Sequence, residues 1–372
     1  MPRKTRRHHP LTRLLALAPL ALLLGGCNLV IMNPAGDVAA QQRDLIVYST
    51  LLMLIIIIPV ILLTLLFAWR YRASNKAAKY DPEWHHSTQL EVIIWAAPLV
   101  IIVALGALTW VGTHLLDPYR PLQRLDAERL IPEEVRPLEV EVVALDWKWL
   151  FIYPQQGIAT VNELRAPVDV PINFRITASS VMNALSIPSL AGMIYAMPGM
   201  ETKLHAVMNQ EGVYDGMSAN YSGAGFSDMR FKFHGMSQQG FDAWVAEAKA
   251  GGGGTLGRAE YLELERPSVR DAVKRFSAID PALFKAVVER CVDPAKMCMS
   301  DMMAIDARGG MGAAGTVNVA SLDYDKTARR GSGPSPAAPA RRFVLALCTP
   351  ADPLGTGLVA SAATPDAGKA TN

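Results

Sequence analysis

Two long stretches of this chain contain no Asp, Glu, Lys or Arg, and each can cross a membrane. Residues 45–69 read LIVYSTLLMLIIIIPVILLTLLFAW, and residues 92–116 form the second stretch. An apolar helix of about 20 residues crosses a hydrocarbon core about 30 Å thick. We therefore predict two transmembrane helices that form a hairpin.

The short connection over 70–91 orients this hairpin. Arg70, Arg72, Lys76 and Lys79 follow directly after the first stretch. Basic residues next to membrane spans favour the cytoplasmic side. We therefore predict a cytoplasmic loop over 70–91, with both ends of the hairpin outside the cytoplasm.

The amino terminus has the pattern of a secretory signal. Basic residues precede an apolar stretch, and Leu24-Gly25-Gly26 stands directly before Cys27. Such a pattern is typical of a signal peptide, and small residues before a cysteine resemble the lipobox of bacterial lipoproteins. We predict a lipoprotein signal peptide over 1–26, an acylated Cys27 and an extracytoplasmic segment over 27–44. An ordinary signal peptide with an incidental cysteine is the alternative.

The remainder of the chain divides by composition. Residues 117–250 contain short runs of alternating polarity between turn residues, such as LEVEVVAL and VPINFRITAS, which predicts an antiparallel β-sandwich. A Gly-rich linker is expected over 251–257 and a small, mixed, partly helical region over 258–320. Residues 321–372, rich in Ala, Gly and Pro, are expected to be disordered.

The overall composition excludes one class of partner. The chain is 51% hydrophobic and 19% charged, with a net charge of +2. Such a small charge provides no extended positive field for nucleic acid. We therefore predict no nucleic acid among the partners of this chain. The two uncharged stretches described above predict a lipid bilayer as a partner.

The order of these parts resembles subunit II of the haem-copper respiratory oxidases, whose outer domain has a cupredoxin fold. The resemblance covers residues 27–250. It rests on Asp146-Trp147-Lys148-Trp149, on Gln89-Leu90-Glu91 at the second span, and on the stretch 212–216 before the family's metal-binding loop. It implies a helical hairpin that carries an all-β, cupredoxin-like periplasmic sandwich.

The copper ligands of that family are replaced in this chain. Members that oxidise cytochrome c hold two coppers through the pattern C-x-E-x-C-G-x-x-H-x-x-M and an upstream histidine. The matching positions here are Asn183, Ser218, Asn220, Ser222, Phe226 and Met229. Hydroxyls, amides and a phenyl ring cannot replace thiolates and imidazoles as copper ligands. We therefore expect no metal in this chain and no catalytic residue, with Met229 in the core.

Because its copper ligands are replaced, this chain resembles the quinol oxidases of cytochrome bo type. The similarity is strongest over 67–76, 146–154 and 156–163. The resemblance implies an accessory subunit of a bacterial inner-membrane complex that oxidises ubiquinol, reduces dioxygen to water and pumps protons. Subunit I would hold the haems, the copper and the quinol. Partners would be subunit I and the small membrane subunits, and cytochrome c would not bind.

Glu91 has two interpretations that the sequence does not separate. By analogy with the family, it is a proton-uptake carboxylate at the mouth of a channel into subunit I. Alternatively, it is a charge at the start of a helix, where the helix dipole favours it. Trp147 and Trp149 match residues that guide electrons towards copper in other members, but without copper we interpret them as packing residues.

The remaining histidines and cysteines give no metal-site spacing. His85, His86, His205 and His234 are expected to be exposed or structural. The carboxy-terminal region contains a cluster of soft sulfur side chains, which could bind Cu(I), pack an amphipathic segment or include an extracytoplasmic disulfide. The cluster consists of Cys291, Met297, Cys298, Met299, Met302 and Met303, and Cys348 would remain unpaired.

Two other functions remain as alternatives. A copper-bearing cytochrome c oxidase subunit would need thiolates where this chain has Ser218 and Ser222. A freestanding lipoprotein with an empty cupredoxin pocket would not purify with a haem-bearing membrane subunit.

Overall fold

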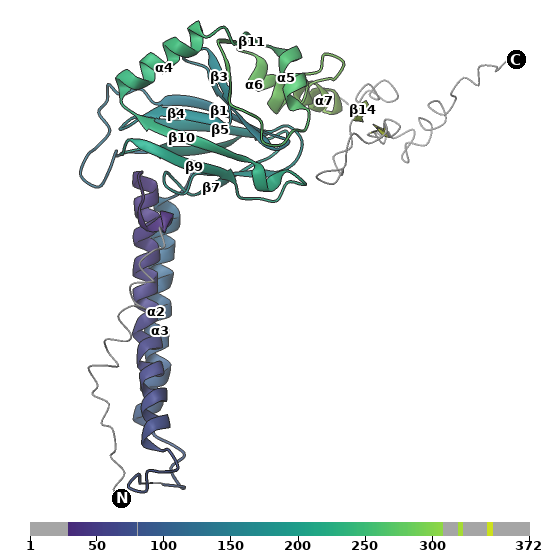
Figure 1. Cartoon of the computed structure of the whole chain (residues 1–372). Coiled ribbons are helices and arrows are strands. Elements are labelled where there is room, and N and C mark those ends of the chain that lie inside the picture. The colour runs from purple at the N-terminus through teal and green to yellow at the C-terminus, as the bar shows by residue number, and fades with distance from the viewer. Residues whose placement is uncertain (1–28, 80, 308–318, 323–340, 345–372) are drawn as a thin grey trace, which may run out of the picture.

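The computed structural model describes residues 29–79, 81–307, 319–322 and 341–344. Two long helices lie side by side and carry a β domain at one end (Figure 1). The predicted signal peptide, Cys27 and Cys348 lie outside the described residues.

The helices and strands have the following bounds. The helices are η2 (Val30–Met32), α2 (Asp37–Arg70), α3 (Thr88–Leu115), η3 (Phe226–Asp228), α4 (Gln238–Ala250), α5 (Arg258–Glu265), α6 (Leu283–Val288) and α7 (Met299–Asp306). The strands are β1 (Leu138–Leu145), β2 (Lys148–Tyr153), β3 (Ile158–Val161), β4 (Glu163–Pro167), β5 (Pro171–Ala178), β6 (Asn183–Ser186), β7 (Met193–Ala196), β8 (Thr202–Val207), β9 (Gly212–Ser218), β10 (Arg230–Met236), β11 (Thr255–Leu256), β12 (Lys274–Phe276), β13 (Ala278–Ile279), β14 (Val319–Leu322) and β15 (Arg341–Val344).

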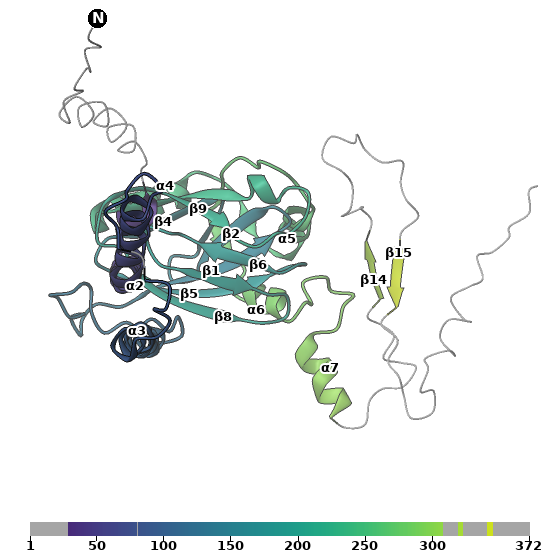
Figure 2. The same ribbon diagram turned by 90° about the horizontal axis from the view of Figure 1, so that it is seen from below.

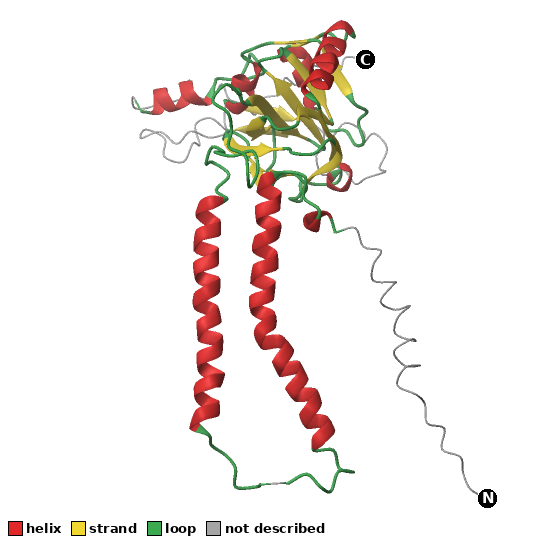
Figure 3. Ribbon diagram, turned by 90° about the vertical axis from the view of Figure 1, so that its left-hand side faces the viewer, coloured by secondary structure: helices red, strands yellow, loops and turns green. Residues whose placement is uncertain are grey.

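The helices α2 and α3 are long and apolar enough to cross a membrane. None of the residues in their most apolar stretches is buried in the chain by itself, so the β domain does not cover them. Figure 3 shows both helices in red, joined by a loop at the end away from the β domain. Pro59 and Pro98 lie inside the two helices, which membrane helices tolerate. The predicted hairpin is thereby confirmed.

The start of α2 differs from the sequence expectation. The apolar stretch begins at residue 45, but the helix already begins at Asp37. Gly36 precedes it in an extended conformation, and the Asp37 carboxylate lies in the first turn, where the helix dipole favours a negative charge. The predicted segment 27–44 therefore contains the first turns of α2, with Val38 and Ala39 buried.

Eleven strands form the two sheets of a sandwich. The first sheet has the order β12-β3-β2-β1-β5-β8, and the second has the order β4-β10-β9-β6-β7. Figure 2, seen from below, shows α2 and α3 almost end-on at one edge of this domain. The predicted cupredoxin-like sandwich is confirmed.

The sandwich was predicted to be antiparallel, but two of its strand pairs are parallel. β1 pairs with β5 in parallel, with Val140 opposite Phe174, and β4 pairs with β10 in parallel. The chain passes from the first sheet (β3) to the second (β4) and back to the first (β5). After this crossover, β5 runs in the same direction as β1. Alternation of polarity along a strand does not encode the direction of the strand relative to its neighbour.

The central strands of the first sheet are buried on both faces. Val140 and Val142 of β1 belong to the cluster between the sheets. Val143 and Leu145, from the same strand, belong to a second cluster on the outer face. Side chains alternate between the two faces of a strand, so this arrangement requires a cover on the outer face as well.

Residues 251–292 provide that cover, which differs from the predicted linker and separate small region. Leu256 is fully buried, and β11, which contains it, pairs with β13. β12 joins the edge of the first sheet beside β3. Tyr261 and Phe284 are buried in the second cluster. The region is therefore part of the β domain.

Polar contacts of two side chains, Lys148 and Arg275, attach this region to the sandwich. Lys148, which is 2% exposed, donates to Arg266 O at 2.8 Å and lies 3.5 Å from Asp271. Burial lowers the pKa of Lys148, and Asp271 opposes this effect. Arg275 of β12 donates to Glu163 of β4 at 2.9 Å. Burial raises the pKa of Glu163, but hydrogen bonds from arginines outweigh burial and hold that pKa below its usual value.

The predicted disordered tail, 321–372, lies mostly outside the described residues. Within its described part, the backbone of β14 pairs antiparallel with that of β15, with Leu322 opposite Arg341. Closer to the sandwich, Cys291 and Cys298 form a disulfide. The disulfide interpretation of this cysteine pair is thus the one that the structure supports.

Candidate functional site

Three of the positions that match copper ligands lie in one hydrogen-bonded group. Ser218 stands at the end of β9 and Asn183 at the start of β6, and both are buried. Ser218 Oγ lies 3.1 Å from Asn183 Oδ1 and 3.2 Å from Asn220 O. Asn220 Nδ2 donates to Met182 O at 3.1 Å. The polar groups at these positions therefore bind one another.

The other three positions lie further along the same loop, which we call the 218–229 loop. Ser222 Oγ lies 4.0 Å from Met229 Sδ, and Met229 is 1% exposed. Met229 belongs to the cluster between the sheets, as expected for a core methionine. Phe226 is half-buried and packs edge-on against Tyr221, with ring centroids 5.6 Å apart.

Trp147 holds the middle of the 218–229 loop. Its indole Nε1 donates to Ser222 O at 3.0 Å. The ring lies against Gly223 and Gly225, and a Cβ on Gly225 would lie 2.4 Å from it. Trp147 itself has a φ of 73°, a backbone conformation that residues other than Gly rarely adopt. Trp149 is fully buried beside Phe231, so both tryptophans pack in the domain interior.

The side chains of the 218–229 loop and Asn183 do not fit a dinuclear copper centre. Such a centre needs thiolates and imidazoles. These positions offer hydroxyls, amides and one thioether, and the hydroxyl of Ser218 already lies within hydrogen-bonding distance of two acceptors. In the part of the chain that the structure describes, no three His, Cys, Asp or Glu side chains are grouped to hold a metal ion.

Glu91 lies in the first turn of α3, at the end of the hairpin away from the β domain. Its Oε1 is 2.7 Å from His86 Nδ1, and both side chains are about half exposed. His86 Nε2 is also 3.2 Å from Thr88 Oγ1. We expected His86 to be exposed or structural, and its contact with Glu91 was not predicted. The short spacing from His86 to a carboxylate in the first helical turn was the signal available.

The other histidines have local partners. His85 Nδ1 is 2.6 Å from Glu83 O, and His205 Nδ1 is 2.7 Å from Asn173 Oδ1. His234 Nε2 is 3.9 Å from a Glu163 carboxylate oxygen. Burial lowers the pKa of His205 and of His234.

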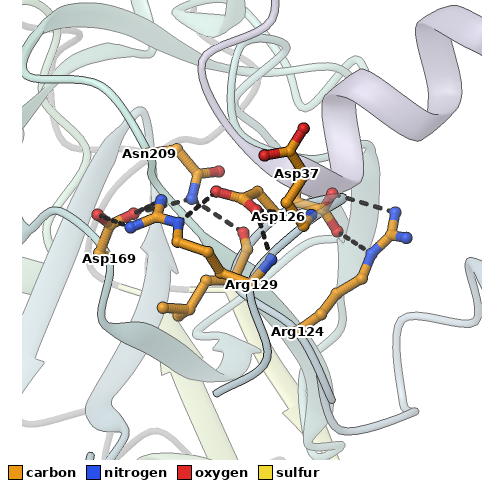
Figure 4. A network of polar contacts seen from close by, with 8 residues as sticks. Asp37, Arg124, Asp126, Arg129, Asp169 and Asn209 are labelled. Carbon is orange, nitrogen blue, oxygen red and sulfur yellow. Dashed lines mark hydrogen bonds and ion pairs between the residues drawn. The ribbon is translucent and has the colours of Figure 1, made fainter. Parts of the chain in front are cut away.

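A polar network joins the hairpin to the β domain, and sequence reasoning did not find it (Figure 4). Asp37, at the start of α2, is 4% exposed and accepts two hydrogen bonds from Arg124, at 3.0 and 3.1 Å. Gln41 donates to the same carboxylate at 2.7 Å. The start of this membrane helix is therefore held by a residue 87 positions away.

A second ion pair extends the network further into the β domain. Arg129 donates to Asp126 at 2.6 Å and to Asp169 at 2.8 and 2.9 Å. Asn209 donates to Asp169 at 3.0 Å and to Leu125 O at 2.9 Å. The hydrogen bond from Arg129 holds the pKa of Asp169 below its usual value.

The backbone before α2 also contacts the β domain. Ala35 N and Gly36 N both donate to Ser189 O, at 2.9 and 3.0 Å. A Cβ at Gly36 would lie 2.5 Å from Val207 O and 2.7 Å from Leu190 O, so only glycine fits at this position. We call Ala35–Ala39 with these contacts the joint.

Comparison with known proteins agrees with this architecture. Residues 138–235 match the family described as "Cytochrome C oxidase subunit II, periplasmic domain", and residues 249–295 match "COX Aromatic Rich Motif". The chain is 54% identical to "Cytochrome bo(3) ubiquinol oxidase subunit 2" of Pseudomonas aeruginosa over 276 residues, which are 74% of this chain and 80% of the relative. The chain belongs to the ubiquinol oxidase subunit 2 family.

Two further relatives extend this family. The chain is 49% identical to "Ubiquinol oxidase subunit 2" of Acetobacter aceti, over 73% of this chain and 85% of the relative. It is 39% identical to "Quinol oxidase subunit 2" of Bacillus cereus, over 69% of this chain and 87% of the relative. The match over 249–295 also shows that the family resemblance continues past residue 250, where the sequence analysis ended it.

Proposed function

We propose that this chain is the accessory subunit II of a proton-pumping ubiquinol oxidase. The complex would oxidise ubiquinol and reduce dioxygen to water, with the haems, the copper and the quinol held by subunit I. The names of the similar proteins support this proposal. The hairpin would pack against subunit I and the small membrane subunits, and the β domain would cover subunit I on the periplasmic side.

One observation carries the proposal. The chain keeps the cupredoxin-like sandwich, but the hydrogen bond between Ser218 and Asn183 occupies the place where electron-accepting relatives bind copper. The packing of Trp147 on Gly225 closes the middle of the same loop. Electron entry through this domain would need ligands that the loop does not offer. Quinol avoids that requirement because it delivers its electrons within the membrane.

The test is purification of the complex through this chain. We expect a haem absorption spectrum, oxygen consumption with ubiquinol and none with reduced cytochrome c. Rapid oxidation of cytochrome c would instead support a copper-bearing electron-transfer subunit. Recovery of this chain without any haem-bearing subunit would support a freestanding lipoprotein.

We propose that Glu91 takes up protons from the cytoplasm for subunit I. The carboxylate lies at the end of the hairpin away from the β domain and is half exposed beside His86. A group at this place can ionise and regain its proton from water before passing it inward. The basic residues after the first span, Arg70 and Arg72, favour a cytoplasmic location for this end.

Glu91→Gln is expected to slow oxygen reduction by the assembled complex severalfold, because an amide cannot exchange the proton. Haem content and subunit yield should stay unchanged. Glu83→Gln is the matched control, since Glu83 is an exposed carboxylate in the same loop. Full turnover in Glu91→Gln would leave Glu91 as a helix-start residue, and equal slowing in both variants would indicate a general effect of loop charge.

We also propose that Cys27 is the acylated first residue of the mature chain. Each buried CH₂ of a lipid adds about 0.8 kcal/mol of membrane affinity, but α2 and α3 already anchor the protein. Cys27→Ala is therefore expected to leave the chain in the membrane and to lower the yield of assembled complex. Mass spectrometry of the mature chain should show the lipid on Cys27. An unmodified Cys27, or a chain that retains Met1, would contradict the proposal.

A further inference from the structure

Four consecutive apolar side chains are exposed just before the joint. Leu29, Val30, Ile31 and Met32 are 62%, 46%, 50% and 43% exposed, and the last three form η2. We call these four residues the apolar turn. Single apolar side chains on a protein surface are ordinary, whereas an apolar patch marks a contact with another protein or with a membrane. The apolar turn therefore points to an apolar partner.

The backbone of the apolar turn makes hydrogen bonds within the turn. Met32 N donates to Leu29 O at 2.9 Å, and Asn33 N donates to Val30 O at 3.1 Å. A backbone polar group without a partner is costly to move out of water. Because these two amides already have partners, the turn can enter apolar surroundings at a lower cost than an extended segment could.

The joint holds the apolar turn beside the membrane helices. Ala35 N and Gly36 N donate to Ser189 O, and only two residues separate this contact from the turn. Figure 3 shows η2 as a short red helix below the β domain, at the level of the first turns of α2. These polar first turns, residues 37–44, precede the uncharged stretch that begins at Leu45. The apolar turn thus lies at the boundary between the polar and the membrane-spanning parts of the hairpin.

We propose that the apolar turn inserts into the membrane leaflet on the side of the β domain. The exposed apolar surface of α2 begins at the same level, with Tyr48 and Leu51 57% and 55% exposed, so the turn continues a surface that is made for lipid. Apolar side chains that lie at the boundary of headgroups and acyl chains are stabilised by burial there. The acyl chains proposed on Cys27, two residues before Leu29, would enter the same leaflet.

This inference goes beyond the oxidase function and does not require that Cys27 is acylated, because the four side chains are exposed at this level in either case. Insertion gives the joint a contact with the bilayer that is separate from α2 and α3. Since the joint is bonded to Ser189 of the β domain, this contact limits tilting of the β domain over the membrane surface.

The test attaches a nitrobenzoxadiazole fluorophore to the full chain through Ile31→Cys, with Cys348→Ser to remove another thiol. The complex is placed in phospholipid vesicles that contain lipids with a nitroxide on the acyl chain. Val273→Cys is the matched control, since Val273 is also 50% exposed and lies next to β12 in the β domain. Both positions are outside the buried clusters, so both variants should fold. Labelling of Cys348→Ser alone measures the background.

Two quenchers distinguish the surroundings of the fluorophore. At position 31 the fluorophore should lose most of its emission to the nitroxide lipid and little to iodide in the water, and at position 273 the reverse should hold. Strong quenching by iodide at position 31 would overturn the proposal, because it would place the turn in water. Protection from both quenchers would also overturn it, since another subunit would then cover the turn.

Two further changes, made in the chain labelled at position 31, identify what holds the turn in the membrane. Leu29→Ser with Met32→Ser should weaken quenching by the nitroxide lipid and strengthen quenching by iodide. Cys27→Ala should leave both unchanged. If the serine variant behaves like its parent, or if Cys27→Ala abolishes quenching by the lipid, the side chains of the turn do not insert by themselves and the proposal is wrong.

Discussion

Ending the chain after Ala250 is expected to leave a β domain that does not fold stably. The truncation removes β12 and all residues of the second cluster that follow Ala250, including the fully buried Phe284. It exposes the outer faces of β1 and β2. Burial of one Val, Leu or Ile side chain contributes about 1.5–3 kcal/mol, and a whole domain is stable by only about 5–15 kcal/mol. Several newly exposed side chains therefore suffice to unfold it.

The matched control for this truncation ends the chain after residue 307, which keeps both clusters and the disulfide. Denaturant unfolding, followed by tryptophan fluorescence, should give one cooperative transition for the control. The shorter chain should show no transition at that denaturant concentration. The single substitution Phe284→Ala should lower the free energy of unfolding by about 3–5 kcal/mol. An unchanged midpoint in the shorter chain would show that the sandwich folds without residues 251–307.

The hairpin and the sandwich were predictable because both follow from patterns within short stretches of sequence. An uncharged stretch such as 45–69 is long enough to cross the membrane by itself. Alternating polarity, as in residues 138–145, identifies a strand. Pairing partners depend on the path of the chain in space, so the parallel contact of β1 with β5 could not be derived in this way.

The cover over the outer face was missed for a different reason. Residues 251–254 are four glycines, whose composition suggests a flexible linker. Here they lead directly into β11, and a Cβ at Gly253 would lie 1.9 Å from Arg275 O. The glycines therefore permit close packing of this segment against β12. Composition alone does not distinguish these two uses of glycine.

The candidate site was predictable only where the resemblance supplied it. Ser218, Ser222 and Asn183 could be placed together because the family's ligand pattern gives their spacing. The hydrogen bond between Ser218 and Asn183 and the packing of Trp147 on Gly225 depend on side-chain geometry that the pattern does not contain. The joint also depends on contacts distant in sequence.

Gly36→Ala is expected to separate the hairpin from the β domain. The added methyl group would lie 2.5 Å from Val207 O and 2.7 Å from Leu190 O. Both atoms belong to the backbone, which cannot turn away as a side chain can. Overpacking of this kind costs about 1–3 kcal/mol, and sometimes more. The backbone contacts of Ala35 and Gly36 with Ser189 should lengthen or break, and the ion pair of Asp37 should weaken.

The measurement is limited proteolysis of the full chain in detergent, with assembly yield as the second readout. Gly36→Ala should be cut faster near the joint and should assemble less well with its membrane partners. Gly192→Ala is the control, since its added Cβ would meet only the end of the flexible Gln42 side chain, 2.7 Å away. If both variants resist proteolysis like the wild type, the joint tolerates the methyl group, and the β domain is not held on the hairpin through Gly36.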